Sequence, residues 1–294
     1  MIHCADMFPA VDTRDLPAVQ SEVEAIFSSL FPGAESGFIA EAFGWMEQWF
    51  TGKYSGYQAI DARYHDLEHT LQGTLCLARI FRGRHFAGMR PVLTPKAFEL
   101  GLFAILMHDT GYLKRVEDTE GTGAKYTATH VRRSGEFARQ FLSEKGFNAA
   151  DTHSVQNMIR CTGVNVDLSA IPFTSELDRV VGFALGTADL LGQMAATDYV
   201  EKLPVLYLEF AEAAKFAGVD SPKSITFRSA EDLMRNTPGF WQHYVLPKVE
   251  KDFGGLHHFL TDPYPDGPNF YLDAIEVNIA KLRRVTAATA GRAI

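Results

Sequence analysis

The sequence predicts an all-α protein, and three observations support this prediction. Apolar residues recur every three or four positions along most of the chain, which is the period of helices with one buried face. Several of these segments begin or end at residues typical of helix boundaries. No segment shows the strict alternation expected of a half-buried strand. Because no linker is visible within residues 60–215, we expect a single domain over residues 1–294.

The first two expected helices carry aromatic residues at helical spacing. Residues 17–31 form the first helix, which Phe31-Pro32-Gly33 ends, and residues 36–50 form the second. Large aromatic side chains at this spacing usually fill a core, so we interpret them as packing residues and not as a cofactor site.

The central helices are predicted from boundary signals as well as from periodicity. A third helix begins near His65 and continues through Phe81, and Thr94-Pro95 begins a fourth that leads to His108-Asp109. Thr is a favoured N-cap and Pro a favoured first helical residue. A polar, glycine-rich loop follows at 114–125. Further helices are expected at 127–145, 150–161, 175–215 (as one or two helices), 229–252 and 269–286.

Composition and charge exclude several classes of partner and location. The formal net charge is −8, so we expect no binding to a nucleic-acid polymer or to an anionic membrane. No apolar run approaches the roughly 18 residues that span a bilayer, and the N-terminus shows no leader pattern. Cys4, Cys76 and Cys161 form no Cys-x-x-Cys motif, and we expect reduced thiols in a cytoplasmic protein.

Residues 99–112 contain the first sign of chemistry. An almost wholly apolar run ends at His108-Asp109, and Thr110-Gly111 turns the chain. An element that is apolar on all sides is buried, and a buried carboxylate needs a compensating partner. A divalent cation would compensate Asp109, because imidazole and carboxylate are both metal ligands. Adjacent helical residues point about 100° apart, so both can face one ion only where the helix ends.

Two further segments supply candidate ligands. His65 and His69 are four residues apart, so on a helix they share one face. Asp189 is a second carboxylate in an apolar segment, in which Gln193 is the other notable polar residue. Neutral imidazoles and carboxylates together suit Mg, Mn, Fe, Co or Zn and do not discriminate among them. The candidate ligands are His69, His108, Asp109 and Asp189.

The order His…His-Asp…Asp on an all-α chain resembles the HD superfamily of metal-dependent phosphohydrolases. The resemblance covers roughly residues 58–215 and implies an HD-domain helical bundle, with extra flanking helices at 15–55 and 222–288. It further implies that the four candidate ligands hold one metal ion and that Asp109 bridges to a second where two are bound.

The segment Tyr64-His65-Asp66-Leu67-Glu68-His69 also resembles the Tyr-His-Asn-x-x-His segment of class I cyclic-nucleotide phosphodiesterases. This resemblance implies that His65 is the general acid that protonates the leaving oxygen and that His69 is a metal ligand. An imidazole suits this proton transfer, because imidazoles in general titrate near neutral pH.

The sequence departs from those phosphodiesterases at points that concern the substrate. They continue His-Asp-x-x-His, whereas the last position here is Tyr112, and no glutamine that would hold a purine is identifiable. The His-Asp-x-x-Glu-Asp of alarmone hydrolases and the Gly-Tyr-Pro of the cyclic-di-GMP group are also absent. We therefore expect a phosphodiesterase-like phosphohydrolase that acts on a small phosphoester, nucleotide-like in character.

Three more residues are candidates for the site. His130, at a helix start, is either a ligand or water-orienting group at a second ion or a helix cap. Lys125, at the end of the polar loop, is a candidate phosphate contact. Gln193 lies one helical turn beyond Asp189 and is a candidate substrate contact.

Two other functions remain open from the sequence. Some proteins of the HD fold bind two irons and oxidise small substrates with O₂, which would require further histidine ligands such as His130 and His153. A metal-binding regulatory domain without turnover is the other alternative, although an intact proton donor would be superfluous there. A homodimer is compatible with an enzyme of this kind, but no residue demonstrates it.

Overall fold

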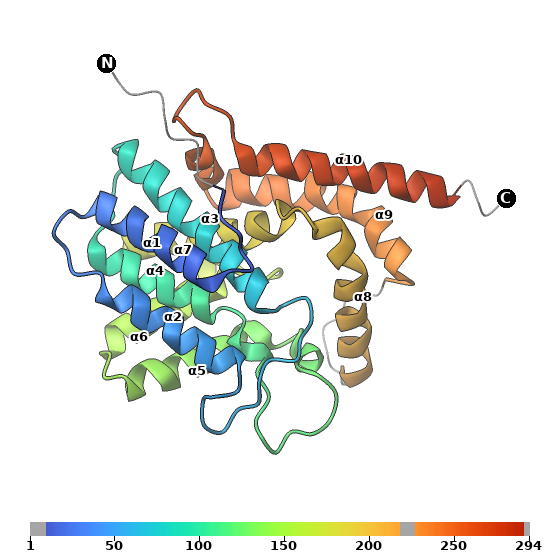
Figure 1. Cartoon of the computed structure of the whole chain (residues 1–294), viewed down its shortest axis with the longest axis horizontal. Coiled ribbons are helices and arrows are strands. Elements are labelled where there is room, and N and C mark those ends of the chain that lie inside the picture. The colour runs from blue at the N-terminus through green and yellow to red at the C-terminus, as the bar shows by residue number, and fades with distance from the viewer. Residues whose placement is uncertain (1–9, 218–226, 291–294) are drawn as a thin grey trace.

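Helices form the whole architecture of the described chain (Figure 1). The computed structural model describes residues 10–217 and 227–290. Within them there is no strand, only two isolated bridges, so the all-α prediction is confirmed. The α-helices are α1 (Leu16–Leu30), α2 (Gly37–Phe50), α3 (Leu67–Phe86), α4 (Pro95–Met107), α5 (His130–Glu144), α6 (Ala149–Arg160), α7 (Glu176–Met194), α8 (Tyr199–Phe216), α9 (Ala230–Phe240) and α10 (Phe270–Ala290).

Short helical turns connect these helices. The 3₁₀ turns are η1 (Thr110–Tyr112), η2 (Gly123–Tyr126), η3 (Leu168–Ala170) and η6 (Leu256–Leu260). Two π-helical turns, η4 (Trp241–Val245) and η5 (Lys248–Asp252), follow α9. The prediction of helix over 229–252 is confirmed, although residues 241–245 and 248–252 have π-helical hydrogen bonds. The prediction of one or two helices over 175–215 is resolved as two, because α7 and α8 meet at 110°.

Helices α3 and α7 lie side by side at the centre of the molecule (Figure 1). Two glycines allow their backbones to approach closely. A Cβ on Gly192 would lie 2.8 Å from the carbonyl group of Gln72, and a Cβ on Gly73 would lie 3.2 Å from Ile105 of α4. These close approaches position α3, α4 and α7, which carry the candidate ligands, against one another.

The N-terminal helices cover one side of this centre with aromatic packing. Phe27 of α1 has its ring centroid 5.1 Å from that of Phe98 in α4, and Trp49 of α2 lies 4.7 Å from Phe141 in α5. Because Phe27 and Trp49 are fully buried, these aromatics fill the core, as their spacing predicted.

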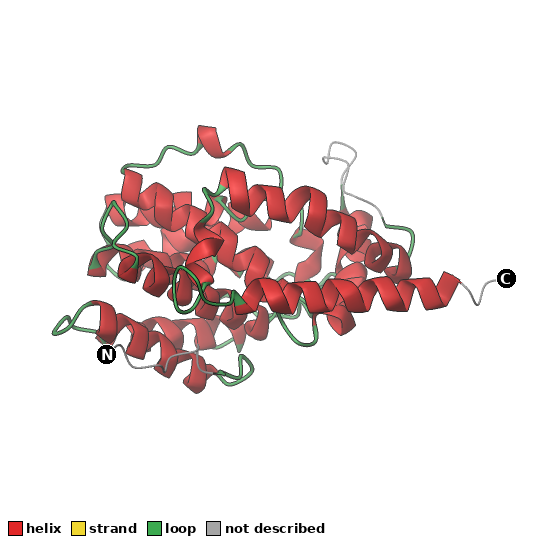
Figure 2. Ribbon diagram, turned by 90° about the horizontal axis from the view of Figure 1, so that it is seen from above, coloured by secondary structure: helices red, strands yellow, loops and turns green. Residues whose placement is uncertain are grey.

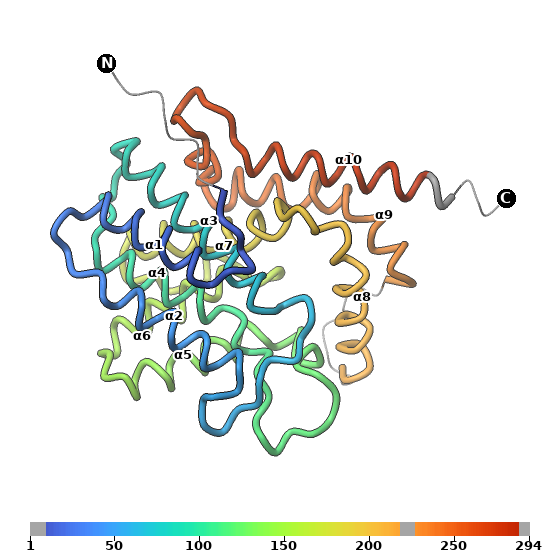
Figure 3. Tube along the Cα trace, viewed as in Figure 1, coloured from blue at the N-terminus to red at the C-terminus, as the bar shows by residue number. Residues whose placement is uncertain are grey.

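The C-terminal helices cover another side (Figure 3). Asn278 of α10 donates hydrogen bonds to the carbonyl oxygens of Met194 and Ala196, where α7 ends. Helix α10 lies along the upper edge of the molecule in Figure 1, and seen from above it projects beyond its neighbours toward the C-terminus (Figure 2). No single helix in the described ranges has the length and apolar content of a membrane span; only the bent pair of α7 and α8 meets those criteria jointly.

Some predictions fall on residues that are not described. Cys76 and Cys161 are buried free thiols, whereas Cys4 and the N-terminal segment that lacks a leader pattern lie outside the described residues. The predicted start of the C-terminal flanking region at residue 222 also lies outside them.

Candidate metal centre

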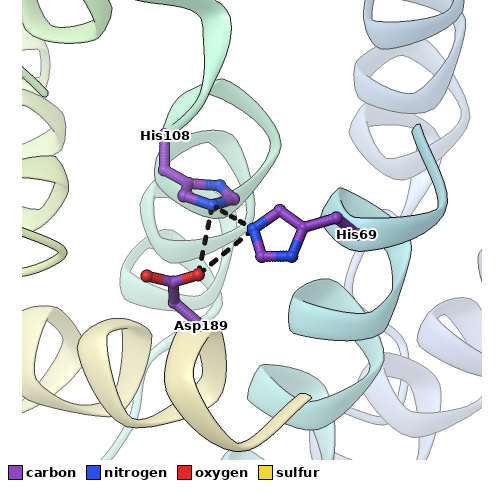
Figure 4. A group of neighbouring side chains, drawn as sticks. All are labelled: His69, His108 and Asp189. Atoms are coloured by element: carbon purple, nitrogen blue, oxygen red, sulfur yellow. Dashed lines mark hydrogen bonds and ion pairs between the residues drawn. The ribbon is translucent and has the colours of Figure 1, made fainter. Parts of the chain in front are cut away.

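Three helices bring the predicted ligands together in space. His69 lies in the first turn of α3, His108 follows the last residue of α4, and Asp189 lies in the final third of α7. Figure 4 shows the two imidazole rings and the Asp189 carboxylate turned toward one another from these three elements. Asp109, which follows His108 directly, completes the cluster.

The distances between the donor atoms fit a shared ion. His69 Nε2 lies 3.4 Å from His108 Nε2 and 3.3 Å from Asp189 Oδ1, and His108 Nε2 lies 3.4 Å from that same oxygen. Asp109 Oδ2 is 3.1 Å from His69 Nε2 and 3.2 Å from His108 Nε2. Donors that bind one ion at about 2.1 Å lie roughly 3–3.5 Å apart, so His69, His108 and Asp189 need no rearrangement to share a cation, and Asp109 lies beside both rings.

The hydrogen bonding of the cluster also favours a cation. Asp109 Oδ2 is buried and makes no hydrogen bond in acceptable geometry, although two ring nitrogens lie close to it. His108 Nδ1 donates to the carbonyl oxygen of Ile105 at 2.7 Å, so in the neutral ring the Nε2 lone pair faces the cluster. An orphaned carboxylate oxygen beside an oriented imidazole lone pair is the arrangement that a divalent ion would satisfy.

The charges of the four groups are coupled. Burial opposes protonation of His69, but Asp109 and Asp189 outweigh it and raise the pKa of His69 to about 9. Burial also opposes protonation of His108, but Asp109 and Asp189 raise its pKa well above the ordinary value. Burial alone would raise the pKa values of Asp109 and Asp189, but the facing imidazoles hold both below the ordinary range. A cation would therefore bind by displacing protons from the two rings.

The local sequence explains why adjacent residues can converge. Helix α4 ends at Met107, so His108 and Asp109 are not constrained to the spacing of a continuing helix. The chain then turns tightly against α5, where a Cβ on Gly111 would lie 2.0 Å from the carbonyl oxygen of His130. The Gly111 N–H donates to Ser134 Oγ at 2.8 Å, which fixes the turn. The prediction that the helix must end at this pair is confirmed.

His65 lies just before α3 and not on it, contrary to the prediction of a helix that begins near this residue. Asp66 is the N-cap, and its carboxylate accepts a hydrogen bond from the His69 N–H at 2.9 Å. The side chains of His65 and His69 are nevertheless neighbours, with ring centroids 5.4 Å apart. Freed from the helix, His65 Nδ1 donates to Glu209 Oε2 of α8 at 2.6 Å.

Glu209 is the functional residue that the sequence reasoning missed. It is 4% exposed, and its other oxygen accepts from the Tyr64 N–H at 2.7 Å. Burial would raise the pKa of Glu209, but His65 and the Tyr64 N–H lower it, so the carboxylate is charged at neutral pH. The sequence contained a pattern that could have identified Glu209, because this carboxylate interrupts an apolar stretch of α8 just as Asp189 interrupts one in α7.

Tyr112 packs against both His65 and His130. Its ring stacks on His65 with centroids 4.5 Å apart and on His130 with centroids 4.8 Å apart, at interplanar angles of 16° and 18°. The residue is fully buried, and its hydroxyl has no hydrogen-bond partner in acceptable geometry. The centroids of the two imidazoles are 6.2 Å apart, so Tyr112 lies beside both rings and fixes their planes by stacking.

His130 lies beside Asp109 Oδ1, whereas the other carboxylate oxygen of Asp109, Oδ2, lies near His69 and His108. His130 Nδ1 donates to the carbonyl oxygen of Thr127 at 2.6 Å, and its Nε2 lies 3.8 Å from Asp109 Oδ1. Burial lowers the pKa of His130, so the ring is neutral with its lone pair on the Asp109 side. Of the two predicted roles, this geometry suits a second ion or an oriented water better than a helix cap. His153, by contrast, is exposed on α6.

Gln193 lies at the cluster, where it supports Asp189. Its Nε2 donates to the Asp189 carbonyl oxygen at 2.9 Å and lies 3.4 Å from Asp189 Oδ1, while its Oε1 accepts from the Tyr64 hydroxyl at 2.8 Å. These contacts hold the Asp189 side chain against the segment that precedes α3. A substrate contact of Gln193 stays a prediction.

Lys125 is engaged within its own loop. Its ammonium group forms an ion pair with Asp118, donates to the Glu120 carbonyl oxygen at 2.6 Å, and lies over the rings of Tyr126 and Phe216. None of these contacts involves the four candidate ligands. A phosphate contact would require this ammonium to leave Asp118, so that role stays a prediction.

The residues of the cluster differ in their exposure to solvent. The side chains of His69, His108 and Asp109 are at most 3% exposed, whereas those of Asp189, His65 and His130 are 12%, 15% and 19% exposed. A substrate would therefore approach past the His65 and His130 rings to the inner ligands.

Comparisons with known proteins identify one family. A family model described as Npun_R2479-like matches residues 115–261. The matched span includes His130, Asp189 and Glu209 but begins after His108 and Asp109. No match was found among curated proteins.

Proposed function

The chain belongs to the Npun_R2479-like family, and from the geometry of its candidate metal centre we propose that it is a metal-dependent phosphohydrolase of the HD type. The observation that carries the proposal is the pairing of two units. One is the cluster of His69, His108, Asp109 and Asp189, and the other is the His65–Glu209 pair beside it. A metal site next to a charge-supported imidazole is suited to break a phosphoester bond.

The residues present fit a divalent ion, which His69, His108, Asp109 and Asp189 would hold. When bound, such an ion supplies Lewis-acid stabilisation of the phosphoryl oxygens and lowers the pKa of a water molecule. The mixture of two imidazoles and two carboxylates accommodates Mg, Mn, Fe, Co or Zn.

In this proposal His65 acts as the general acid. Because Nδ1 donates to Glu209, Nε2 is the nitrogen that delivers a proton to the leaving oxygen. The buried Glu209 carboxylate stabilises the charged imidazolium and fixes the ring direction, and Tyr112 fixes the ring plane by stacking. The reaction then ends with neutral His65 and a protonated alcohol or hydroxyl product.

In this proposal Asp109 and His130 orient the attacking water. Asp109 Oδ1 and His130 Nε2 are hydrogen-bond acceptors 3.8 Å apart on the exposed side of the cluster. A water between them would have both protons directed at acceptors and a lone pair directed outward, toward a phosphorus atom.

The two alternatives are less well supported. A di-iron oxygenase gains support from His130 beside Asp109, but the other candidate ligand, His153, is exposed on α6. A non-catalytic metal domain gives the His65–Glu209 pair no role. Glu209 is 4% exposed, and burial of its charged carboxylate carries a desolvation cost that such a domain would not need.

The test combines metal analysis with a hydrolysis assay. Protein purified without added metal is analysed for bound ions and then assayed with bis-p-nitrophenyl phosphate and p-nitrophenyl phosphate in the presence of Mn²⁺ or Mg²⁺. We expect turnover that His65→Ala and Asp109→Ala abolish and that the control His153→Ala leaves unchanged, because His153 is an exposed histidine away from the cluster. Two irons per chain with no hydrolysis would contradict the proposal in favour of oxygen chemistry. A chain without metal affinity would contradict the metal centre itself.

A further inference from the structure

A second group of metal-ligand side chains lies between α9 and α10. Glu250 belongs to the π-helical turn η5, and His257 and His258 belong to the 3₁₀ turn η6. Between them, Gly254 and Gly255 have φ values of +67° and +71°, in the left-handed region that glycine adopts without steric cost. These two glycines turn the chain back, so that η6 faces η5.

The two histidines converge on one carboxylate oxygen. Glu250 Oε2 lies 3.2 Å from His257 Nε2 and 3.1 Å from His258 Nε2, and the two ring centroids are 4.1 Å apart. Successive residues of a 3₁₀ helix point about 120° apart, so two neighbouring rings that reach the same atom are not a consequence of the helical turn. The arrangement instead resembles ligands gathered around a common centre.

We propose that Glu250, His257 and His258 form a second metal site, which binds a transition-metal ion of the zinc type. Two imidazoles and one carboxylate favour Zn²⁺, Co²⁺ or Ni²⁺ over Mg²⁺ and Ca²⁺, which prefer oxygen ligands. The donor separations match those of ligands that bind one ion at about 2.1 Å.

The burial of the three residues indicates how the ion is held. His257 is 1% exposed and forms the fixed inner ligand, while the side chains of Glu250 and His258 are about half exposed. The remaining coordination position therefore faces solvent and would be filled by water. An ion at this position would tie η5 to η6 and so fix the connection that leads into α10.

This second site is distinct from the candidate metal centre. Turn η6 packs on the last turns of α3, where a Cβ on Gly83 would lie 1.9 Å from the Phe259 carbonyl oxygen. Gly83 follows His69 by 14 residues of the same helix, which is about 21 Å along the axis of α3 at 1.5 Å per residue. The proposal therefore does not depend on phosphohydrolase activity.

Zinc titration of the full chain tests the proposal. Chelator-treated protein is titrated with Zn²⁺ by calorimetry and with Co²⁺ by visible absorption, for the wild type, His258→Ala, Glu250→Gln and the control His243→Ala. His243 is an exposed histidine in the neighbouring turn η4 and does not belong to the cluster. We expect each cluster variant to bind one equivalent fewer than the wild type, or to bind it about 100-fold more weakly, while His243→Ala behaves as the wild type.

Equal metal binding by the wild type and the cluster variants would overturn the proposal. If the wild type and both cluster variants bind the same number of equivalents with the same affinities, this cluster binds no metal. Because Glu250 and His258 are about half exposed, both substitutions leave the core untouched, and circular dichroism verifies that the variants are folded. Ions at the candidate metal centre are common to all four proteins, so the difference reports on the second site alone.

Discussion

Replacement of Glu209 by glutamine separates the charge of this side chain from its shape. The carboxylate receives two hydrogen bonds, from His65 Nδ1 at 2.6 Å and from the Tyr64 N–H at 2.7 Å. Glutamine keeps one oxygen, which can still accept from Tyr64. Its amide group then faces His65 Nδ1 with a second donor, so the charge-assisted hydrogen bond is lost.

The expected magnitude follows from the burial of this pair. A hydrogen bond to a charged group contributes about 1.5–3 kcal/mol, and little solvent is present to replace it because Glu209 is 4% exposed. We expect the free energy of unfolding to fall by about 2 kcal/mol. We also expect kcat to fall about 100-fold with little change in KM, since His65 loses its fixed direction but the metal ligands are intact.

The pH dependence of stability gives an independent measurement. The folded-state pKa of Glu209 is lowered from its ordinary value of 4.5, so its contribution is present above that pH and is lost as the pH falls through the folded-state value. The difference in unfolding free energy between the wild type and Glu209→Gln should therefore be constant above about pH 5.5 and should narrow in more acidic solution. Urea denaturation at a series of pH values measures this difference.

The matched control is Glu212→Gln, one turn further along α8. Glu212 also accepts two hydrogen bonds from a preceding segment, from the Thr122 N–H and hydroxyl, but it makes no described contact with His65. Its glutamine variant should retain kcat within about threefold. If Glu209→Gln is folded and retains the wild-type kcat while His65→Ala is inactive, the inferred role of the His65–Glu209 pair is wrong.

Three further predictions concern the cluster and its supports. Asp189→Asn should weaken binding of the divalent ion by about 100-fold in a metal titration, and unchanged affinity would remove Asp189 from the ligand set. Gly111→Ala should lower the unfolding free energy by about 3 kcal/mol, because its Cβ would meet the His130 carbonyl oxygen at 2.0 Å. The control is Gly135→Ala in α5, where the new Cβ meets no neighbouring atom within 4 Å; this substitution should instead raise the unfolding free energy by about 0.5–1 kcal/mol. Urea denaturation of both variants measures the two changes in unfolding free energy, which should have opposite signs. Tyr112→Phe removes a buried hydroxyl without a partner, so stability measured by the same method should be unchanged or higher by about 1 kcal/mol, and a large loss would reveal a missed hydrogen bond.

The ligands could be predicted from the sequence because burial is encoded locally. Asp109 and Asp189 each interrupt an apolar helical pattern, and a buried carboxylate demands a partner wherever the fold places it. The boundary of α4 was also local information, because Thr94 caps the start and the His108-Asp109 pair ends it. These features do not depend on how distant helices pack.

Contacts that depend on packing could not be predicted in this way. Glu209 and His65 are 144 residues apart in the sequence, and the hydrogen bond between them requires the 110° change of direction between α7 and α8. Lys125 was assigned to phosphate because of its position in the chain, but the competing Asp118 lies seven residues earlier in the same loop. Neither the bend nor this loop closure follows from hydrophobic periodicity.

The start of α3 was predicted too early, although the sequence contains a typical N-cap residue there. Asp66 is a typical N-cap, and its use as one places His65 outside the helix, where its ring can turn toward α8. Residues 229–252 were predicted to be helical and are so, but the change to π-helical hydrogen bonds in η4 and η5 was not predicted. Pro238 and Pro247, which lack a backbone N–H, lie in this segment.

The spread of the ligands along the chain has a consequence for biosynthesis. Three of them, His69, His108 and Asp109, leave the ribosome long before Asp189, which is carried by the central helix α7. Until α7 is made, the face of α3 at Gln72 and Gly73 has no helix to cover it, and the nascent site has three ligands. A metal ion bound at the candidate centre would therefore gain Asp189 only when α7 packs against α3 and closes this part of the core.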